Sequence, residues 1–185
     1  MTTVFIAGSI KIKKLHPKFV ERISNILSDK MDVVVGDANG ADAAIQRELY
    51  NQQAENVTVY CTGTKPRNNV GNWKVVNVQS SAETGTRAFF TAKDLKMAGV
   101  ADYGLMLWDT ASTGTLSNIF ELLKGGKKSV VFVNKDQHFV YIKGPRDIEE
   151  LVSIMSDGAK AQAERKVGLR SMMFQLTNRQ IGLPL

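Results

Sequence analysis

Two stretches of the sequence decide the fold: VVVGDANGAD at residues 33–42 and LMLWDTASTGT at residues 105–115. Each begins with a short apolar, β-rich run, continues through a loop that contains glycine, and opens onto a helical pattern. Glycine lets backbone N–H groups approach a ligand closely, and the N-terminus of a helix favours negative charge. Two such junctions at the same edge of one sheet would make a site for a phosphorylated small molecule.

Short apolar runs alternate with helical patterns on both sides of these stretches. Strands bounded by crossover helices, with nearly continuous apolar residues, indicate a parallel sheet that is covered on both faces. We therefore predict an α/β fold, a Rossmann-like three-layer α/β/α sandwich with a mainly parallel sheet. The predicted strands are 4–7, 32–35, 57–61, 103–108 and 129–133, and the predicted helices begin at Pro17, Ala43, Thr86 and Thr115.

The pattern changes in two places. Residues 62–85 form a polar connection with a short candidate strand at 75–76, and it is either a functional loop or a poorly ordered one. After residue 135 we expect an edge strand at 139–142, a helix over 145–155 and a single amphipathic helix over 159–174. The whole chain, 1–185, is predicted to be one domain with its core at about 3–134 and a C-terminal strand and helices at about 138–178. The apolar end of the last helix favours a homodimer.

Composition narrows the class of protein. The chain has 185 residues, 43% of them hydrophobic, and a net charge of +6. A lone cysteine, Cys61, rules out an intramolecular disulfide and, with no apolar run of about 20 residues and no signal-peptide pattern, favours the cytoplasm. The basic residues are scattered, so a nucleic-acid partner is not favoured. His16 and His138 lack metal-ligand spacing, so we expect no metal and no cofactor.

Three loops are expected at the carboxyl edge of the sheet, where open parallel sheets bind ligands. The first loop offers backbone N–H groups, the second offers carboxylates for sugar hydroxyls or a base amine, and the third offers hydroxyls at a helix start, a cradle for phosphate. The structural alternative is that their Asp, Ser and Thr residues only cap helices and close turns. Neither G-x-G-x-x-G nor G-x-x-x-x-G-K-[ST] is present. The predicted ligand-binding residues in the three loops are Gly8, Ser9, Gly36, Asp37, Asn39, Gly40, Asp42, Asp109, Ser112, Gly114 and Thr115.

The order of these motifs, Gly8-Ser9, then Gly-Asp-Ala-Asn-Gly-Ala-Asp at 36–42, then Trp-Asp-x-x-Ser-x-Gly-Thr at 108–115, resembles the SLOG superfamily. This superfamily of LOG/DprA-like Rossmannoid proteins includes a YspA/YpsA-related branch, which residues 3–134 resemble most. The resemblance implies binding of nucleotides, nucleotide sugars or related derivatives. It also implies two activities within the superfamily, phosphoribohydrolase catalysis by LOG-type enzymes and ligand sensing.

The chain departs from the LOG-type pattern P-G-G-x-G-T-x-x-E. Asn118 stands at the position of the glutamate, and an amide cannot act as a general base. Glu121 lies one helical turn further on and shares that face of the helix. The carboxylates that could serve hydrolysis are Asp37, Asp42, Asp109 and Glu121. Of these, Asp109, which is the best placed at a strand end, and Glu121 are the candidate catalytic residues.

Further candidates lie on the helix before the fourth strand and in the polar connection. The resemblance to the YspA-like branch implies that Arg87 is a pocket residue, which would hold a phosphate. The alternative is that Arg87 lies on a solvent-exposed face of its helix. Lys93-Asp94 is interpreted as a surface or capping pair, and Phe90 as a core or dimer contact. Trp73 is a stacking candidate if its loop folds over the pocket.

Three hypotheses follow from the sequence. The first is a binding or sensing protein for a nucleotide or nucleotide derivative (a nucleotide sugar or an ADP-ribose-like molecule). The second is an N-glycosidase or phosphoribohydrolase-type enzyme acting on nucleoside monophosphates. The third is a nucleic-acid-binding protein, which rests on positive charge alone.

Overall fold

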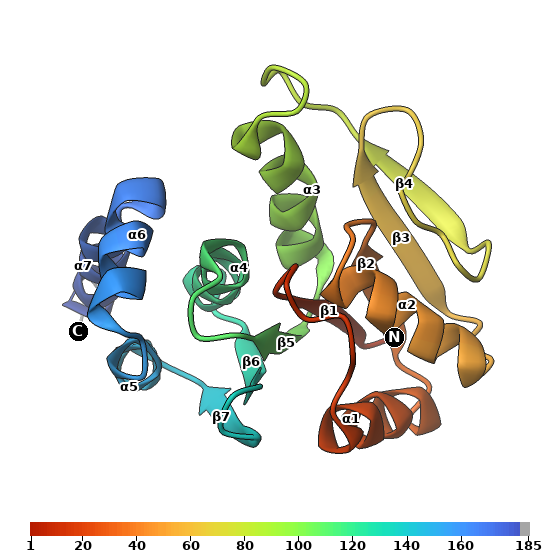
Figure 1. Ribbon diagram of the computed structural model, residues 1–185, viewed down its shortest axis with the longest axis horizontal. Coiled ribbons are helices and arrows are strands. Elements are labelled where there is room, and N and C mark those ends of the chain that lie inside the picture. The colour runs from red at the N-terminus through yellow and green to blue at the C-terminus, as the bar shows by residue number, and fades with distance from the viewer. Residues whose placement is uncertain (182–185) are drawn as a thin grey trace.

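The computed structural model describes the backbone of residues 1–181 and the side chains of residues 1–177. Its centre is a seven-stranded sheet in the order β4-β3-β2-β1-β5-β6-β7, in which β7 alone runs antiparallel to its neighbour (Figure 1). The strands are β1 (Thr3–Gly8), β2 (Asp32–Gly36), β3 (Val57–Thr62), β4 (Lys74–Val78), β5 (Tyr103–Trp108), β6 (Lys128–Val133) and β7 (His138–Ile142).

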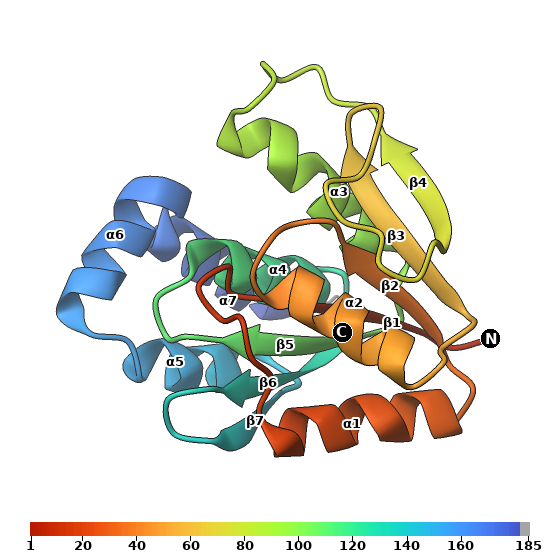
Figure 2. The ribbon, with the colours of Figure 1, turned by 45° about the vertical axis from the view of Figure 1, so that its right-hand side comes forward.

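Helices cover both faces of the sheet. The first two pack on one face and the others lie on the opposite side (Figures 1 and 2). The helices are α1 (Pro17–Ser28), α2 (Ala41–Asn51), α3 (Arg87–Val100), α4 (Thr113–Lys124), α5 (Pro145–Ser153), α6 (Asp157–Val167) and α7 (Leu169–Ile181). The predicted Rossmann-like α/β sandwich is thus confirmed.

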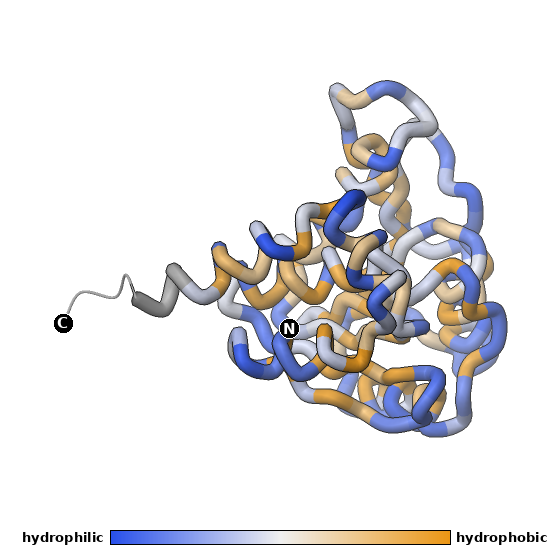
Figure 3. Tube along the Cα trace, turned by 60° about the vertical axis from the view of Figure 1, so that its left-hand side comes forward, coloured by the Kyte–Doolittle hydropathy of each residue, from blue (hydrophilic) through white to orange (hydrophobic). Residues whose placement is uncertain are grey.

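Alternate residues of each strand supply two separate cores. In β1, Val4 and Ile6 pack with α1 and α2, whereas Phe5 and Ala7 pack with the opposite helices. This alternation follows from the two-residue period of a strand, and apolar residues on both faces are needed because both faces are covered. Hydrophobic residues accordingly gather along the strands and the inner faces of the helices, and hydrophilic residues on the outer connections (Figure 3).

The register of the central strands brings the three predicted loops together. Ile6 of β1 is aligned with Val35 of β2, and Gly8 is aligned with Leu107 of β5. The loops that follow β1, β2 and β5 therefore leave the sheet side by side at its carboxyl edge. This placement matches the prediction made from the glycine junctions.

Two predictions about the outer elements need correction. The candidate strand at 75–76 is longer, and β4 forms an edge of the sheet, parallel to β3. The single helix predicted over 159–174 is wrong: α6 ends at Val167, its C-cap Gly168 has a left-handed φ of 64°, and α7 begins at the residue after that glycine. A residue in this conformation cannot continue a right-handed helix, so the glycine separates the two. The described part of α7 packs against α6, α5 and α4, and its Leu169 and Leu176 are buried.

In the part of the chain that is described, no helix is both long and apolar enough to cross a membrane.

Candidate functional site

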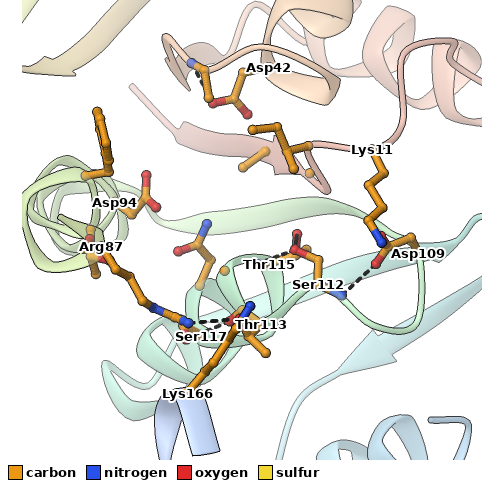
Figure 4. A pocket seen from close by; sticks show the side chains of 18 of the residues that line it. Lys11, Asp42, Arg87, Asp94, Asp109, Ser112, Thr113, Thr115, Ser117 and Lys166 are labelled. Carbon is orange, nitrogen blue, oxygen red and sulfur yellow. Dashed lines mark hydrogen bonds between the residues drawn. The ribbon is translucent and has the colours of Figure 1, made fainter. Parts of the chain in front are cut away.

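A cavity of about 590 Å³ lies at the carboxyl edge of the sheet (Figure 4). Its walls come from the loops after β1, β2 and β5, from one face of α3, from the first turns of α4 and from α6. Cavities of 300–1,000 Å³ are typical of small-molecule sites. The predicted ligand-binding residues that line it are Gly8, Asp42, Arg87, Asp109, Ser112, Gly114 and Thr115.

The N-terminus of α4 forms one end of the cavity. Ser112 is its N-cap, with a hydroxyl that accepts a hydrogen bond from the Thr115 N–H at 3.4 Å. The loop before it is held by Asp109, whose Oδ1 accepts the N–H groups of Ala111 at 3.0 Å and Ser112 at 2.6 Å. Both Ser112 and Asp109 therefore have the structural roles that were considered for this loop, while they also line the cavity.

Basic side chains surround this helix terminus. Arg87 of α3 donates from Nη1 to the hydroxyl of Thr113 at 3.0 Å. Lys166 of α6 and Lys11 of the loop after β1 also line the cavity, and Figure 4 shows Lys166 near Thr113 and Lys11 pointing toward Asp109. Positive charge beside the unpaired N–H groups of a helix start favours an anion there.

The opposite end of the cavity holds a buried ionic cluster around Lys93. The Lys93 side chain is only 4% exposed, and its Nζ lies 2.8 Å from Asp94 Oδ1, 3.8 Å from Asp42 Oδ2 and 3.9 Å from Asp37 Oδ1. The interpretation of Lys93-Asp94 as a surface pair is therefore wrong. Lys93 lies one helical turn before the buried Met97, on the face of α3 that packs inward.

The carboxylate of Asp37 is hydrogen-bonded to Arg67, and Asp37 does not line the cavity. Arg67, from the connection after β3, binds the carboxylate of Asp37 with its Nη2 at 2.8 Å, its Nε at 3.0 Å and its backbone N–H at 3.0 Å. Burial raises the pKa of Asp37, but these hydrogen bonds and the charge of Lys93 outweigh it, so the net pKa is lowered. The same guanidinium lies 4.5 Å from the centre of the Phe90 ring, and both side chains line the cavity.

Asp42 is a carboxyl of the cluster whose pKa is raised. Burial raises its pKa to about 6, although Lys93 and the hydrogen bond from the Ala38 N–H oppose the shift. The pKa of Lys93 is itself raised, because the charges of Asp94 and Asp42 outweigh the burial of the ammonium. Asp42 thus provides the cavity with a carboxyl group that gains or loses a proton near pH 6.

Two of the predicted glycines shape the site through close packing. A Cβ on Gly36 would lie 2.5 Å from Lys93 Nζ and would collide with the carboxylate of Asp42. Gly40 has a φ of 78°, and a Cβ there would collide with the carbonyl group of Ile10. Both positions require glycine for the chain to pass, and neither residue lines the cavity.

Other predicted residues also lie outside the cavity lining. The Ser9 hydroxyl accepts the Asp109 N–H at 3.1 Å and lies 3.3 Å from the Thr115 hydroxyl, so it ties the first loop to the third. The side-chain oxygen of Asn39 accepts a hydrogen bond from Asn68. Glu121 forms an ion pair with Lys124 at 3.6 Å, and Trp73 donates to the Ala54 carbonyl.

Five charged residues at the cavity were missed as site residues by sequence reasoning: Lys11, Arg67, Lys93, Asp94 and Lys166. Lys93 lies four residues before Met97, and this helical spacing was the one sequence feature that could have indicated that Lys93 faces inward. Among the described residues, no group of three or more His, Cys, Asp or Glu side chains is suited to a metal ion.

Comparison with known proteins gives no family model and no curated protein that matches the chain. The fold and the cavity define a Rossmann-like α/β protein with a mainly parallel sheet and, at its carboxyl edge, a cavity whose lining includes charged and hydroxyl side chains. The SLOG resemblance stays a prediction from the motifs.

Proposed function

We propose that the protein binds a nucleotide or nucleotide derivative in the cavity at the carboxyl edge of the sheet. The observation that carries the proposal is the position of Arg87, whose guanidinium is hydrogen-bonded to Thr113 in the first turn of α4. A phosphate at this helix terminus would receive backbone N–H groups, hydroxyl donors and a guanidinium with bidentate geometry. Lys166 adds a further positive charge to the same end of the cavity.

The other end of the cavity suits the uncharged part of such a ligand. The carboxylates of Asp42 and Asp94 accept hydrogen bonds and so favour sugar hydroxyls or a base amine. Phe90, whose ring lies against the Arg67 guanidinium, adds an apolar surface to the lining. Both ends carry both signs of charge: Asp109 lies at the α4 end, and Lys93 lies among the carboxylates at the other end. The α4 end is favoured for the phosphate because its helix terminus and Arg87 lie together there.

A screen by thermal shift tests the proposal. Nucleotides, nucleotide sugars and ADP-ribose derivatives are added to the purified protein, and the products of every hit are analysed. A ligand at 100 times its Kd stabilises the fold by about 2.7 kcal/mol, which raises Tm by several degrees. Arg87→Ala should reduce the shift by about half or more, because a ligand bound tenfold more weakly is then present at only about 10 times its Kd, whereas Lys96→Ala, at an exposed site of the same helix, should retain the shift. Absence of any hit would contradict the proposal.

A second candidate function, N-glycosidic hydrolysis, is favoured by the position of Asp42 in the cavity with a pKa of about 6. In this reaction the carboxylate takes a proton from water as the water oxygen bonds to C1′. The C1′–N bond breaks, its electrons go to the base, and solvent protonates the base. Release of free base by the parent protein, and its loss in Asp42→Asn with binding retained, would support hydrolysis. Hits that stay intact would favour binding alone.

A further inference from the structure

A second concave surface lies at the opposite, amino-terminal edge of the sheet. It is a groove of about 330 Å³ between α1 and the starts of β1, β5 and β6, closed on its far side by the end of β7. The groove exists because β6 is followed by a hairpin to β7 rather than by another crossover helix, so α1 alone flanks this part of the sheet face. Figure 2 shows α1 running alongside β7.

The floor and walls of the groove are apolar. Val4, Ile26 and Leu105 form its buried part, and Met31 and Val130 are half-buried. Tyr103 and Tyr141 stand at its sides, and each is 49% exposed. Apolar surface gathered in a concave site of this volume is typical of a ligand pocket.

The rim of the groove carries only positive charge. The charged residues that line it are Arg22, Lys128 and Lys143. Within residues 1–177 no carboxylate forms an ion pair with any of the three. The nearby Asp102 accepts a hydrogen bond from the Thr3 N–H and is not part of the lining.

Two of these cations are held beside Tyr141. Arg22 donates to the Tyr141 hydroxyl at 3.3 Å and lies 4.9 Å from the centre of the Phe139 ring. Lys143 Nζ lies 6.0 Å from the centre of the Tyr141 ring. Lys128 reaches the groove from the start of β6, next to Tyr103 on β5. Arg22 and Lys143 therefore lie together at the Tyr141 wall of the groove, and Lys128 lies at the strand position paired with Tyr103.

We infer that this groove binds a small anionic amphiphile, an apolar aliphatic or aromatic body that carries one carboxylate or sulfonate group. The apolar body would lie between the half-exposed rings of Tyr103 and Tyr141, and the acidic group would lie near the three cations, for which residues 1–177 supply no ion-paired carboxylate. Charge complementarity selects an anionic ligand over a neutral or cationic one of the same shape. The inference stands apart from the proposed nucleotide site, since the two lie at opposite edges of the sheet.

Titration with 8-anilinonaphthalene-1-sulfonate, an aromatic amphiphile with one sulfonate, tests the inference. We expect saturable fluorescence enhancement on the folded protein, with displacement by octanoate and little displacement by octanol or octylamine. The double variant K128E/K143E should weaken binding by about tenfold or more. K13E/K14E, which has the same change of net charge at two exposed lysines, should bind as the parent does.

Tyr103→Ala provides an independent variant, because it removes an exposed wall and leaves the core intact. It should also weaken binding, and a near-UV circular dichroism spectrum shows that each variant is folded. Equal binding by the parent and K128E/K143E would overturn the inference. Release of the dye as the protein dimerises at higher concentration would also overturn the inference, because the groove would then be an interface with a second copy of the chain. Arg87→Ala should leave dye binding unchanged, so this test is separate from that of the nucleotide site.

Discussion

Replacement of Lys93 by methionine tests the buried ionic cluster. At an effective dielectric constant of about 20, an opposite charge about 4 Å away is worth about 4 kcal/mol. Lys93 Nζ has one carboxylate at 2.8 Å and two more at 3.8 and 3.9 Å. Together they offset the several kcal/mol needed to take an ammonium out of water. Methionine fills a similar volume and leaves these carboxylates without their shared cation.

We expect Lys93→Met to lower the free energy of unfolding by about 3–5 kcal/mol at pH 8, the range found when one partner of a buried ion pair is removed. For a chain of this size, such a loss lowers Tm by roughly 6–20 °C. At pH 5 the loss should be smaller by about 1 kcal/mol or more, because Asp42 then carries a proton and needs no counter-charge. Adding Asp42→Asn to Lys93→Met should recover about 1–2 kcal/mol at pH 8 for the same reason.

Urea denaturation followed by circular dichroism at pH 5 and pH 8 measures these differences. Lys96→Met, on the exposed side of the same helix, is the control and should change stability by no more than about 0.5 kcal/mol. A loss below about 1 kcal/mol for Lys93→Met, equal at the two pH values, would refute the description of Lys93 as a buried cation that holds three carboxylates.

Three further predictions concern the stability of the fold: two test the cluster around Lys93, and one tests the break between α6 and α7. The folded-state pKa of Asp42, about 6, lies above the ordinary value of 3.8 for an aspartate side chain. The folded state therefore binds more protons than the unfolded state between these values, and this group lowers stability as pH rises through the window. Asp42→Asn removes the effect, so its stability relative to the parent should rise by up to about 3 kcal/mol between pH 4 and pH 7 in urea titrations. Gly36→Ala should lower the free energy of unfolding by about 1–3 kcal/mol, because its methyl group would displace Lys93 and Asp42; unchanged denaturation would show that the cluster can shift freely. Gly168→Ala should lower Tm by roughly 2–4 °C, since its φ of 64° disfavours a side chain, and a calorimetric scan with no change would contradict that backbone strain.

Much of the fold could be predicted because local patterns and tertiary structure agree. The continuous apolar runs at Val33–Val35 and Leu105–Trp108 are buried on both faces, as central parallel strands must be. The break at Gly168 could not be predicted from apolar spacing alone. The hydrophobic pattern continues through it, and only the left-handed backbone of one residue divides the two helices.

The loops of the candidate site were predicted from the sequence, but the buried ionic cluster around Lys93 was not. Ser112 and Arg87 both line the cavity, as predicted. Ser112 could be predicted from its local motif at a helix start, and Arg87 from its position in the SLOG resemblance. Lys93 was interpreted as a surface residue because its partners Asp37 and Asp42 lie more than 50 residues earlier and meet it only in the folded chain. Lys166 was missed because it reaches the cavity from α6, outside the region of family resemblance.

Calorimetric titration of matched pairs of ligands, a nucleoside and its 5′-monophosphate, tests the central claim most directly. The account predicts that the monophosphate binds about tenfold or more tightly than the nucleoside to the parent protein and to Lys96→Ala. In Arg87→Ala this preference should be clearly smaller, because the phosphate has lost its guanidinium and keeps only the N–H groups, the hydroxyls and Lys166. If the parent protein bound neither ligand, or if Arg87→Ala kept the full preference for the monophosphate, the assignment of Arg87 and the α4 terminus as a phosphate site would be contradicted.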